Sequence, residues 1–579
     1  MLVVGCTERG LAGRGVLVVV MMGRGRGRAP RDLHAAAQGV AAAALQAAVG
    51  ELVAALLPGA RSPLGGLGKA LIDHTPGPLV DVTVALVEDK DKPLLRGGLL
   101  AGLGAAGVAA GLASHARGRG GRAGGAGVLL GAGALGALAG ASRPAAAAAP
   151  TVMANAAGAA AGALALHLQS PSLPSGPPWR PGRTIRQVAG VLALAAAAEL
   201  AAAALLQRRL RLGVALPAPS RPLPPPPRPS RFAVAGLGPL FTPVADFYVT
   251  DTAFPALQVD ARSWRLRVGG LVEREVELSY LQLLGVGLVE RDVTLVCVHN
   301  PVGGRRIGTA RWLGVPVAAL LALAGVRPGA ERLLARSADG FTASVPLELA
   351  VGSGSGGGLV VVGMNGAPLT PAHGWPARLL VAGIYGYNAN TKWLTELELT
   401  TAAAVGDYWT VRGWPSRPAR VWPGSRIDTP TDRACLPQGV VTVAGVAWAP
   451  PGGVCGVRVQ VDGGRWVAAE LGPELAPTAW RQWRLDWQAS PGAHWLQVRA
   501  EGREGLQPTG QAPPYPAGAM GLHRVGVRVV PATAATGGRA RPAPAVERVV
   551  ALARARTRLA ARGLAAWRAA SAKGVEETR

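Results

Sequence analysis

The pattern of hydrophobic and polar residues differs between two parts of the chain. The first part carries five apolar stretches, most of them of about the length that crosses a bilayer, and small residues crowd all of them. Gly and Ala let helix backbones approach closely in lipid, where packing must replace the hydrophobic effect. We therefore predict a membrane bundle of four to five helices. The stretches are 36–57, 94–114, 124–140, 151–168 and 188–206, with a polar connection at 61–92.

In the second part the runs of apolar residues are shorter and alternate with polar residues, as in a soluble protein. Residues 264–268 alternate as a strand, and residues 293–296 form a β-branched, apolar run typical of a buried strand. Residues 317–324 are predicted to form a helix, and residues 333–336 and 341–345 a hairpin around a turn. This mixture of elements predicts an α+β domain.

The pattern changes again after residue 429. Short alternating runs are separated there by Pro- and Gly-rich turns, which is typical of an antiparallel β-sandwich of the immunoglobulin type. The runs are 439–448, 456–461, 466–471, 482–487 and 493–500. Six segments are therefore expected along the chain. They are a basic N-terminal extension (1–35), the transmembrane bundle (36–210), a Pro-rich linker (211–235), a catalytic α+β domain (236–428), the immunoglobulin-like sandwich (429–531) and a basic helical tail (532–579).

Charge and cysteine content narrow the class of protein. The net charge is +26, yet no nucleic-acid-binding motif accompanies the arginines, so we expect no nucleic-acid partner and assign part of the excess to membrane-flanking segments. Residues 546–570 predict a basic amphipathic helix that either lies on lipid or is solvated. Cys435 and Cys455 either pair in an oxidising compartment or remain free thiols. The membrane face of the soluble part stays open, because both ends of the bundle carry arginines.

A single thiol marks the candidate site. Cys297 lies where the predicted strand 293–296 gives way to the loop HNPVGG, which is rich in turn formers and backbone N–H groups. A lone cysteine is most often a small buried core residue. Placed at the start of such a loop, however, a thiolate can also hold a soft ligand beside a bulky anion.

Several ordered blocks around this loop resemble the sulfite-oxidase family of molybdopterin-dependent oxidoreductases. The resemblance covers roughly residues 247–530, about half of the chain, and rests on the order and spacing of the blocks together. The blocks are FY at 247–248, WRL at 264–266, CVHNPVGG at 297–304, RW at 311–312, DG at 339–340, NG at 365–366, HGWPAR at 373–378, GIYG at 383–386 and KW at 392–393.

The resemblance implies a cofactor, molybdenum with molybdopterin, and a role for each matching residue. Cys297 would be the metal ligand and Tyr385 an active-site phenol. The planar guanidinium of Arg378 can donate paired hydrogen bonds to phosphate or pterin acceptors, and the ammonium of Lys392 is a compact positive charge. Arg311 fits a structural ion pair as well as a cofactor contact. The full cofactor-binding set is Phe247, Tyr248, Asn300, Gly303, Gly304, His373, Arg378 and Lys392.

The sequence also departs from the family pattern. His299 and Pro301 replace residues common after the family's cysteine, and the segment 246–248 lacks the neighbouring basic residues with which animal enzymes bind sulfite, so the substrate is left open. No CxxCH motif occurs, so a haem is not expected.

The expected protein is an integral membrane oxidoreductase of the bacterial cell membrane. It would catalyse two-electron oxygen-atom transfer on a small substrate, for which sulfur compounds are one candidate class, and exchange electrons with a quinone or cytochrome. Its partners would be the lipid bilayer and a second copy, bound through the sandwich as a homodimer. Two alternatives remain, namely a reductase of an oxidised substrate such as a sulfoxide, and a cofactor-free binding or assembly module anchored in the membrane.

Overall fold

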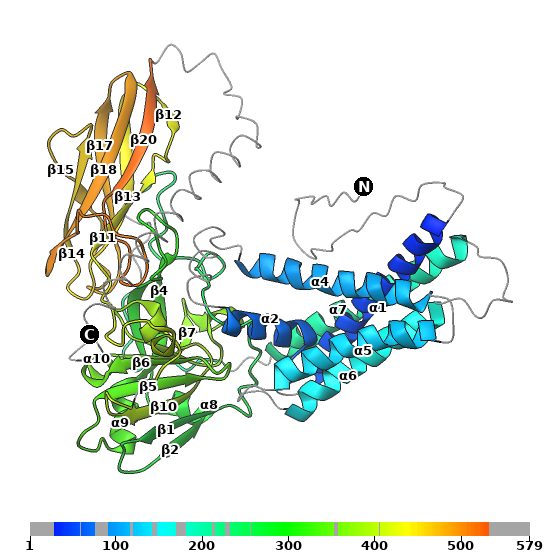
Figure 1. Cartoon of the computed structure of the whole chain (residues 1–579). Helices are drawn as coiled ribbons and strands as arrows, with labels where there is room; N and C mark the ends of the chain where they lie inside the picture. Colours follow the sequence, from blue (N-terminus) through cyan, green and yellow to red (C-terminus); the bar gives the residue numbers. More distant parts are fainter. Residues whose placement is uncertain are drawn as a thin grey trace, which may run out of the picture. The chain divides into compact units, whose positions relative to one another are not determined.

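The computed structural model divides into two compact units, each described by itself. One unit comprises residues up to 70 and 93–208, which include most of the N-terminal helices, and the other comprises residues 71–92 and the elements from β1 onward (Figure 1). The predicted tail helix and the first 27 residues lie outside the described residues. The structure describes residues 28–57, 60–75, 91–115, 120–141, 148–169, 181–210, 215–225, 232–254, 256–352, 357–404 and 406–531.

Five of the N-terminal helices are long and apolar enough to cross a membrane, as the sequence predicted. They are α1 (Arg28–Leu56), α4 (Asp91–Ser114), α5 (Gly120–Ala141), α6 (Ala148–Gln169) and α7 (Pro181–Leu210). The connection after α1 begins with a further helix, α2 (Pro63–His74), which the sequence pattern had not indicated. Small residues make this helix possible: a side chain at Gly66 would meet the backbone of Gly136 and Gly140 at 3.0–3.1 Å.

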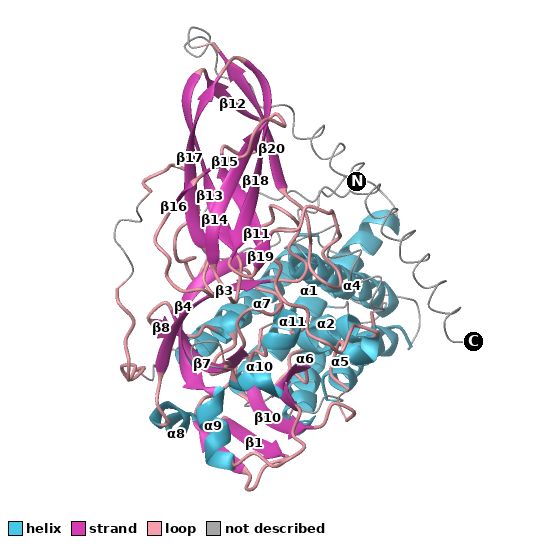
Figure 2. Cartoon of the chain, turned by 90° about the vertical axis from the view of Figure 1, so that its left-hand side faces the viewer, coloured by secondary structure: helices cyan, strands magenta, loops and turns pink. Residues whose placement is uncertain are grey.

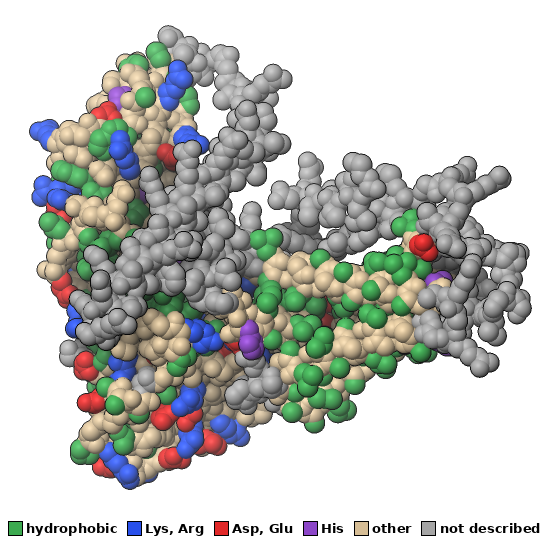
Figure 3. All heavy atoms as spheres, viewed as in Figure 1, with side chains coloured by type: hydrophobic (Ala, Val, Ile, Leu, Met, Phe, Trp, Pro, Cys, Tyr) green, Lys and Arg blue, Asp and Glu red, His purple; other side chains and the backbone are tan. Residues whose placement is uncertain are grey.

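Close contacts between helix backbones and hydrogen bonds from side-chain amides stabilise the helical unit. A Cβ at Gly39 would lie 1.8 Å from the carbonyl oxygen of Gly107, so α1 and α4 touch through glycine. The buried Gln46 amide of α1 donates to the Leu129 carbonyl at 3.1 Å. Large leucines such as Leu135 and Leu138 are exposed, and Figure 3 shows hydrophobic side chains spread over the helices. This distribution is typical of a lipid-facing surface.

Two sheets form the α+β part of the second unit. One has the order β2–β1–β10–β5–β6, with β1 parallel to β10, and the other has the order β3–β4–β7–β8, with β9 beside β7. Helix α9 is bounded as predicted, and the predicted hairpin is β5 with β6. The bounds are β1 (Arg265–Gly270), β2 (Val276–Ser279), α8 (Tyr280–Gly285), β3 (Val289–Val296), β4 (Ile307–Pro316), α9 (Val317–Ala324), β5 (Arg332–Ser337), β6 (Thr342–Pro346), α10 (Leu347–Val351), β7 (Leu359–Met364), β8 (Ala367–Pro368), β9 (Arg378–Leu380), α11 (Gly386–Ala389) and β10 (Leu394–Thr400).

A shared hydrophobic core positions the end of β3. Five consecutive residues, from Asp292 to Val296, are buried, because β3 pairs with β4 on one side and is covered on both faces. Trp312 of β4 is fully buried, and its indole nitrogen donates to the Val293 carbonyl at 3.2 Å. Helix α9 buries Val317, Leu320, Leu321 and Ala324, the spacing of one helical face. The residue after β3 is therefore placed rigidly.

The C-terminal part consists of two sheets with a common core. Their orders are β11–β13–β17–β16 and β12–β20–β18–β14–β15, and Figure 2 shows their long strands running together. Val443 of one sheet and Val498 of the other belong to one buried cluster, so the sheets pack face to face. The predicted runs appear as β13 to β18, whereas β11, β12 and β20 were not predicted. That the two sheets form a sandwich of the immunoglobulin type stays a prediction. The bounds are β11 (Gly424–Thr429), β12 (Ala434–Pro437), β13 (Gly439–Trp448), β14 (Val454–Val461), β15 (Val467–Ala468), β16 (Glu470–Leu471), β17 (Arg481–Ala489), β18 (Gly492–Gly502), β19 (Gly505–Leu506) and β20 (His523–Val530).

Candidate active site

Cys297 lies at the base of the loop that joins β3 to β4. Its backbone N–H donates to the Arg306 carbonyl at 3.0 Å, and its own carbonyl accepts from the N–H of Asn300 at 2.9 Å. The thiol is free and the residue is buried, with 6% of its surface exposed. The loop is thus closed at its base, and the thiol is held where two strands end.

Side chains from the C-terminal sheets hold the tip of this loop. Arg426 of β11 donates to the Gly304 carbonyl at 2.9 Å, while the Asn300 side-chain oxygen accepts from the N–H of Arg306 at 2.8 Å. His523 of β20 fills the space beside Gly303, and its Nδ1 accepts from the N–H of Ile427 at 3.0 Å. The loop geometry therefore depends on both parts of the second unit.

Gly303 is expected to tolerate no side chain. Its φ is +76°, and an added Cβ would lie 2.2 Å from the His523 ring. Gly366 has a similar φ of +79° but open space around it, so Gly366→Ala measures the backbone strain alone. We expect Gly303→Ala to lower the unfolding free energy by about 1–3 kcal/mol more than Gly366→Ala does, as measured by thermal unfolding. Equal losses would show that the His523 contact does not constrain the loop.

Several groups around the thiol influence its ionisation. Burial, the largest influence, raises the pKa of Cys297, but the hydrogen bond and charge of His299 and the positive charge of Arg306 outweigh it and leave the pKa below its usual value. The His299 ring stacks on Tyr515 at 6.5 Å between centroids. Arg306 is buried beside the thiol and was missed in the sequence. The signal for it was the basic pair that follows directly after Gly304.

A buried guanidinium lies in the same unit. Arg378 begins β9, is 4% exposed and lies 5.3 Å from the centre of the Trp312 ring. One nitrogen donates to the His373 carbonyl at 3.2 Å, but Nε has no hydrogen-bond partner among the described residues. Burial lowers the pKa of Arg378 to about 10, although Tyr248 and Asp251 partly offset it. A buried cation with an unused donor is suited to an anion.

Lys392 adds a second buried cation next to Arg378. Its ammonium donates to Asp251 at 2.7 Å and to the Ala372 carbonyl at 2.8 Å. Burial lowers the pKa of Lys392 to about 8, and the Asp251 charge opposes that shift. A Cβ at Gly374 would lie 3.0 Å from the Cβ of Lys392 and 3.2 Å from that of Arg378, so this glycine lets the two cations approach. Asp251 was not singled out in the sequence.

His373 is held as a neutral ring. Its Nε2 lies 3.1 Å from the Val244 carbonyl, which requires Nε2 to carry the proton, and Nδ1 is then an acceptor with no partner among the described residues. Burial lowers the pKa of His373 to about 4. Phe247 packs edge-on against both His373 and Trp312, at 5.8 and 5.6 Å between ring centres. Phe247 thus belongs to the core and supports the His373 ring.

The depressed pKa of His373 predicts a pH dependence of stability. The unfolded chain binds a proton near pH 6.5, whereas the folded protein binds it only near pH 4. Stability is therefore lost as the pH falls from 6.5 to 4, by about 3 kcal/mol for this residue. Thermal unfolding of wild type and His373→Gln across this range should show a steeper loss for the wild type. Parallel curves would contradict the buried, neutral ring.

Tyr385 caps the start of α11 and is 3% exposed. Its hydroxyl accepts from the N–H of Trp422 at 3.5 Å, and burial, with the Cys297 charge as a lesser cause, raises the pKa of Tyr385 to about 12. The pKa of the half-buried Tyr248 is also raised by burial and by Cys297, whereas Arg378 lowers it. Tyr248 is therefore within electrostatic range of both the thiol and the guanidinium.

The structure brings the predicted residues into two neighbouring groups. One contains Cys297, its loop residues and Tyr385, and the other contains His373, Arg378 and Lys392. Arg311 belongs to neither, because it makes a two-point ion pair with Asp292 at 2.8 and 2.9 Å. Some of the buried polar atoms without a hydrogen-bond partner among the described residues lie in the second group and in the segment before Lys392, and others lie elsewhere in the structure. Those near the second group are His373 Nδ1, Arg378 Nε, Asn390 Oδ1 and Thr391 Oγ1.

This donor set can bind a polar, anionic molecule next to a soft metal. The unused donors and acceptors suit a heterocycle with a phosphate, because buried polar groups need partners. Within the described residues no group of three or more His, Cys, Asp or Glu side chains is placed to hold a metal ion. One thiolate is a sufficient protein ligand where an organic dithiolene provides further sulfur.

Comparison with known proteins shows which proteins this part of the chain resembles. Residues 252–409 match the model of the family described as oxidoreductase molybdopterin binding domain. Mitochondrial sulfite oxidase of Mus musculus is 30% identical over 335 residues, which cover 49% of this chain and 61% of that protein. The uncharacterized oxidoreductase YuiH of Bacillus subtilis is 29% identical over 173 residues, covering 29% of this chain and 83% of that protein.

The similarity covers only part of the length of these relatives. The chain spans between 54% and 62% of the length of the five sulfite oxidases among these relatives. Among solved structures, the sulfane dehydrogenase SoxCD of Paracoccus pantotrophus is similar, with 25% identity and a TM-score of 0.46 over 50% of this chain and 82% of that one. The helical N-terminal part lies outside the residues that the family model matches.

Proposed function

We propose, from the premise that this chain carries a molybdopterin-binding oxidoreductase domain of the sulfite-oxidase type, that it is a membrane-anchored enzyme. Its reaction would be two-electron oxygen-atom transfer on a small, sulfur-containing substrate. The observation that carries the proposal is a buried thiol at a strand end, together with the buried cations Arg378 and Lys392 and the unpartnered atoms His373 Nδ1 and Arg378 Nε. Those atoms make a cofactor-free module the weaker alternative, since their burial costs free energy without a partner.

Each residue of the site would contact a different part of the cofactor. Cys297 would be the protein ligand of molybdenum, and the Asn300 to Gly304 loop would keep the thiol in place. Arg378 and Lys392 would neutralise the phosphate, with Asp251 orienting Lys392. His373 would accept a hydrogen bond from the pterin through Nδ1, on a ring fixed by Val244 and Phe247. Tyr248 would lie between the metal and the phosphate ends.

Bound molybdenum would supply the exchange of an oxygen atom and two electrons with the substrate, and the protein would supply position and electrostatics. Tyr385 keeps its proton at neutral pH, because its pKa is raised to about 12, and would donate a hydrogen bond to a substrate oxygen. His299, through its hydrogen bonds and charge, and then Arg306, through its charge, would favour the thiolate form of Cys297. Burial of both groups would exclude water from the reacting atoms.

The remaining parts of the chain would determine where the reaction takes place. Five helices of membrane length would anchor the enzyme in a bacterial cell membrane, near a quinone or a cytochrome that exchanges electrons with the site. The C-terminal sheets would form a homodimer of the immunoglobulin-like type. The catalytic domain would span 236–428 and the sandwich 429–531. Strand β11 (Gly424–Thr429) pairs with β13 of the C-terminal sheets but lies almost entirely before this boundary, and its Arg426 helps to hold the cysteine loop.

Turnover in both directions tests this function. The purified full chain would be assayed for oxidation of sulfite with an artificial electron acceptor, and for reduction of methyl phenyl sulfoxide with a reduced viologen. Turnover of either compound that requires Cys297 supports the proposal. No turnover of any oxygen-atom donor or acceptor by protein loaded with molybdenum would contradict it.

A further inference from the structure

Lys92 brings a second lysine to Asp251, the carboxylate that holds Lys392. It is the second residue of α4 and belongs, with the rest of residues 71–92, to the second unit. The Lys92 ammonium donates to Asp251 Oδ1, and the Lys392 ammonium donates to Oδ2. Each carboxylate oxygen therefore has its own lysine. The Lys92 side chain is 26% exposed and that of Lys392 8%, so Lys92 is the outer of the two.

A separate contact holds the other end of the segment 71–92 on the same unit. The Tyr408 hydroxyl donates to Asp73 Oδ1 at 3.2 Å, and the Arg412 guanidinium donates to the Asp73 carbonyl at 3.3 Å. The same guanidinium lies 3.7 Å from the centre of the Tyr408 ring. Two independent contacts thus hold this segment, and the position of Lys92 does not depend on one ion pair alone.

The second lysine changes the charge that Lys392 can offer. Three cations, Lys92, Lys392 and Arg378, lie within electrostatic range of one carboxylate, Asp251, which leaves two positive charges in this cluster. Two of the three N–H groups of the Lys392 ammonium have acceptors among the described residues, Asp251 and the Ala372 carbonyl. One N–H group and a net positive charge therefore remain for a ligand.

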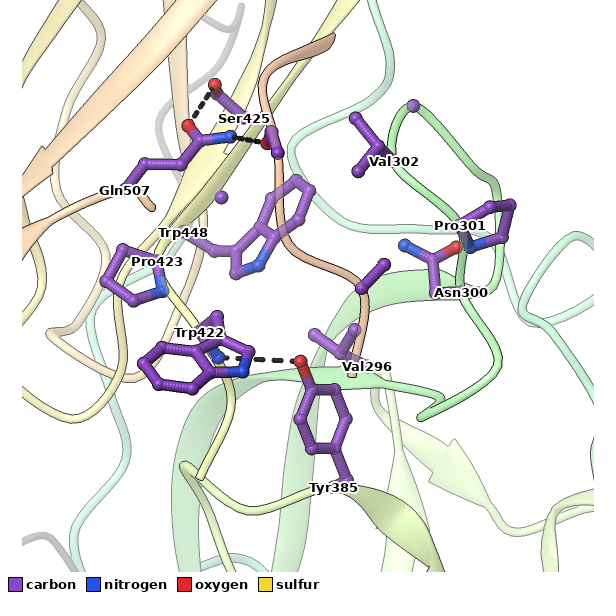
Figure 4. Close-up of a pocket in the computed structure, with 14 residues that line it drawn as sticks. Val296, Asn300, Pro301, Val302, Tyr385, Trp422, Pro423, Ser425, Trp448 and Gln507 are labelled. Carbon is purple, nitrogen blue, oxygen red and sulfur yellow. Dashed lines mark hydrogen bonds between the residues drawn. The ribbon is translucent and has the colours of Figure 1, made fainter. Parts of the chain in front are cut away.

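An anion finds no such partner in the pocket beside the cysteine loop. Figure 4 shows that pocket, and no Lys, Arg, His, Asp or Glu is among its 14 lining residues. An anion that leaves water for a site without a cation loses its hydration and gains no charge partner. Of these two places, only the cluster around Asp251 suits the doubly charged end of a ligand.

We propose that Lys92 is a positioning residue of the anion-binding site at Lys392 and Arg378, and that the segment between α2 and α4 completes this site. Lys92 neutralises Asp251 and so leaves the Lys392 ammonium available to a dianion such as a phosphate monoester. The inference rests on the proposed function, because the phosphate of the molybdenum cofactor would be that dianion. It adds that the N-terminal part of the chain contributes to cofactor binding.

Sulfate is the probe that tests the charge of Lys92, because it stays a dianion over the pH range used. The full-length protein would be purified from a host that cannot make the cofactor and titrated by calorimetry. Lys92→Met should weaken sulfate binding at least about fivefold at neutral pH. Sulfate binding by Lys92→Met as tight as that of the wild type would overturn the inference.

Two further variants control for the loss of charge. Lys92→Arg keeps the charge and should bind sulfate within about twofold of the wild type. Arg433→Met removes an equal charge from a side chain that is 91% exposed, and screening by solvent should keep its affinity within about twofold as well. If Lys92→Arg bound sulfate no better than Lys92→Met, the charge would not be the property that matters, and the inference would fall.

A pH profile separates this role from that of a structural ion pair. Burial lowers the pKa of Lys392 to about 8; Asp251 opposes this shift, and the charges of Arg378 and Lys92 add to it, while the nearby His373 ring is neutral. Sulfate binding by the wild type should therefore weaken as the pH rises through 8. In Lys92→Met the weakening should begin at a higher pH. An ion pair with a structural role alone would change the midpoint of thermal unfolding and leave the profile in place, which would overturn the inference.

Pterin retention distinguishes this inference from the proposed function. In a host that makes the cofactor, Lys92→Met should lose pterin during dialysis at least about fivefold faster than the wild type. Sulfate binding that depends on Lys92, in a chain that never takes up pterin, would leave the inference standing and remove the proposed function. A loaded enzyme whose Lys92→Met variant kept both its pterin and its sulfate affinity would do the reverse.

Discussion

Cys297→Ser is expected to lower turnover by at least about a hundredfold while the protein still folds and still contains pterin. A hydroxyl is a hard, weakly acidic ligand, so it cannot replace a thiolate in a sulfur-rich coordination sphere. Pterin should remain, because the contacts proposed for it come from His373, Arg378 and Lys392 rather than from the thiol. The measurement is the turnover number beside the pterin content of each purified protein.

An exposed thiol supplies the control. Cys435→Ser makes the same chemical change on β12, where the side chain is free and exposed, and should leave turnover within about twofold. If Cys297→Ser kept turnover within tenfold of the wild type, the thiol would not be a metal ligand. Cys297 would then be the small core residue that a lone cysteine usually is.

Arg378→Met is expected to lower cofactor affinity by about 10- to 100-fold without lowering the stability of the fold. The guanidinium is buried, donates one hydrogen bond to a carbonyl and has no carboxylate partner in the described ion pairs. Replacing such a charge by an apolar side chain of similar volume is neutral or stabilising. The two readouts are pterin per chain and the midpoint of thermal unfolding.

Arg311→Met should give the opposite pattern. Arg311 pairs with Asp292, which is 2% exposed, so its removal leaves a buried carboxylate unpaired and costs about 3–5 kcal/mol of stability. Pterin per folded chain should not change. If Arg378→Met lost stability like Arg311→Met and kept its pterin, Arg378 would be a structural residue.

Local pattern was sufficient for much of the fold. Helix α9 begins and ends at the predicted residues because one apolar face and a terminal glycine define it, and strand β13 is bounded as predicted by its turns. The five membrane-length helices were found because their length and composition are local properties. Helix α2 was missed, since its polar flanks hid a stretch of small residues that is buried only by contact with other helices.

The site was only partly accessible to such reasoning. The blocks around Cys297, His373 and Lys392 pointed to one centre, but they could not show which neighbours complete it. Asp251 is a partner only because the chain brings it within 2.7 Å of Lys392, 141 positions away. Arg426 and His523 likewise contact the cysteine loop only because of how β11 and β20 pack. Neither strand was predicted from the sequence.

The molybdenum and pterin content of the purified full-length chain tests the central claim most directly. The protein would be produced in a host able to make the cofactor, and metal would be measured by mass spectrometry and pterin by fluorescence after oxidation. We predict close to one molybdenum and one pterin per chain. Folded protein that contains neither would contradict the account, because the unused buried donors would then serve something other than this cofactor.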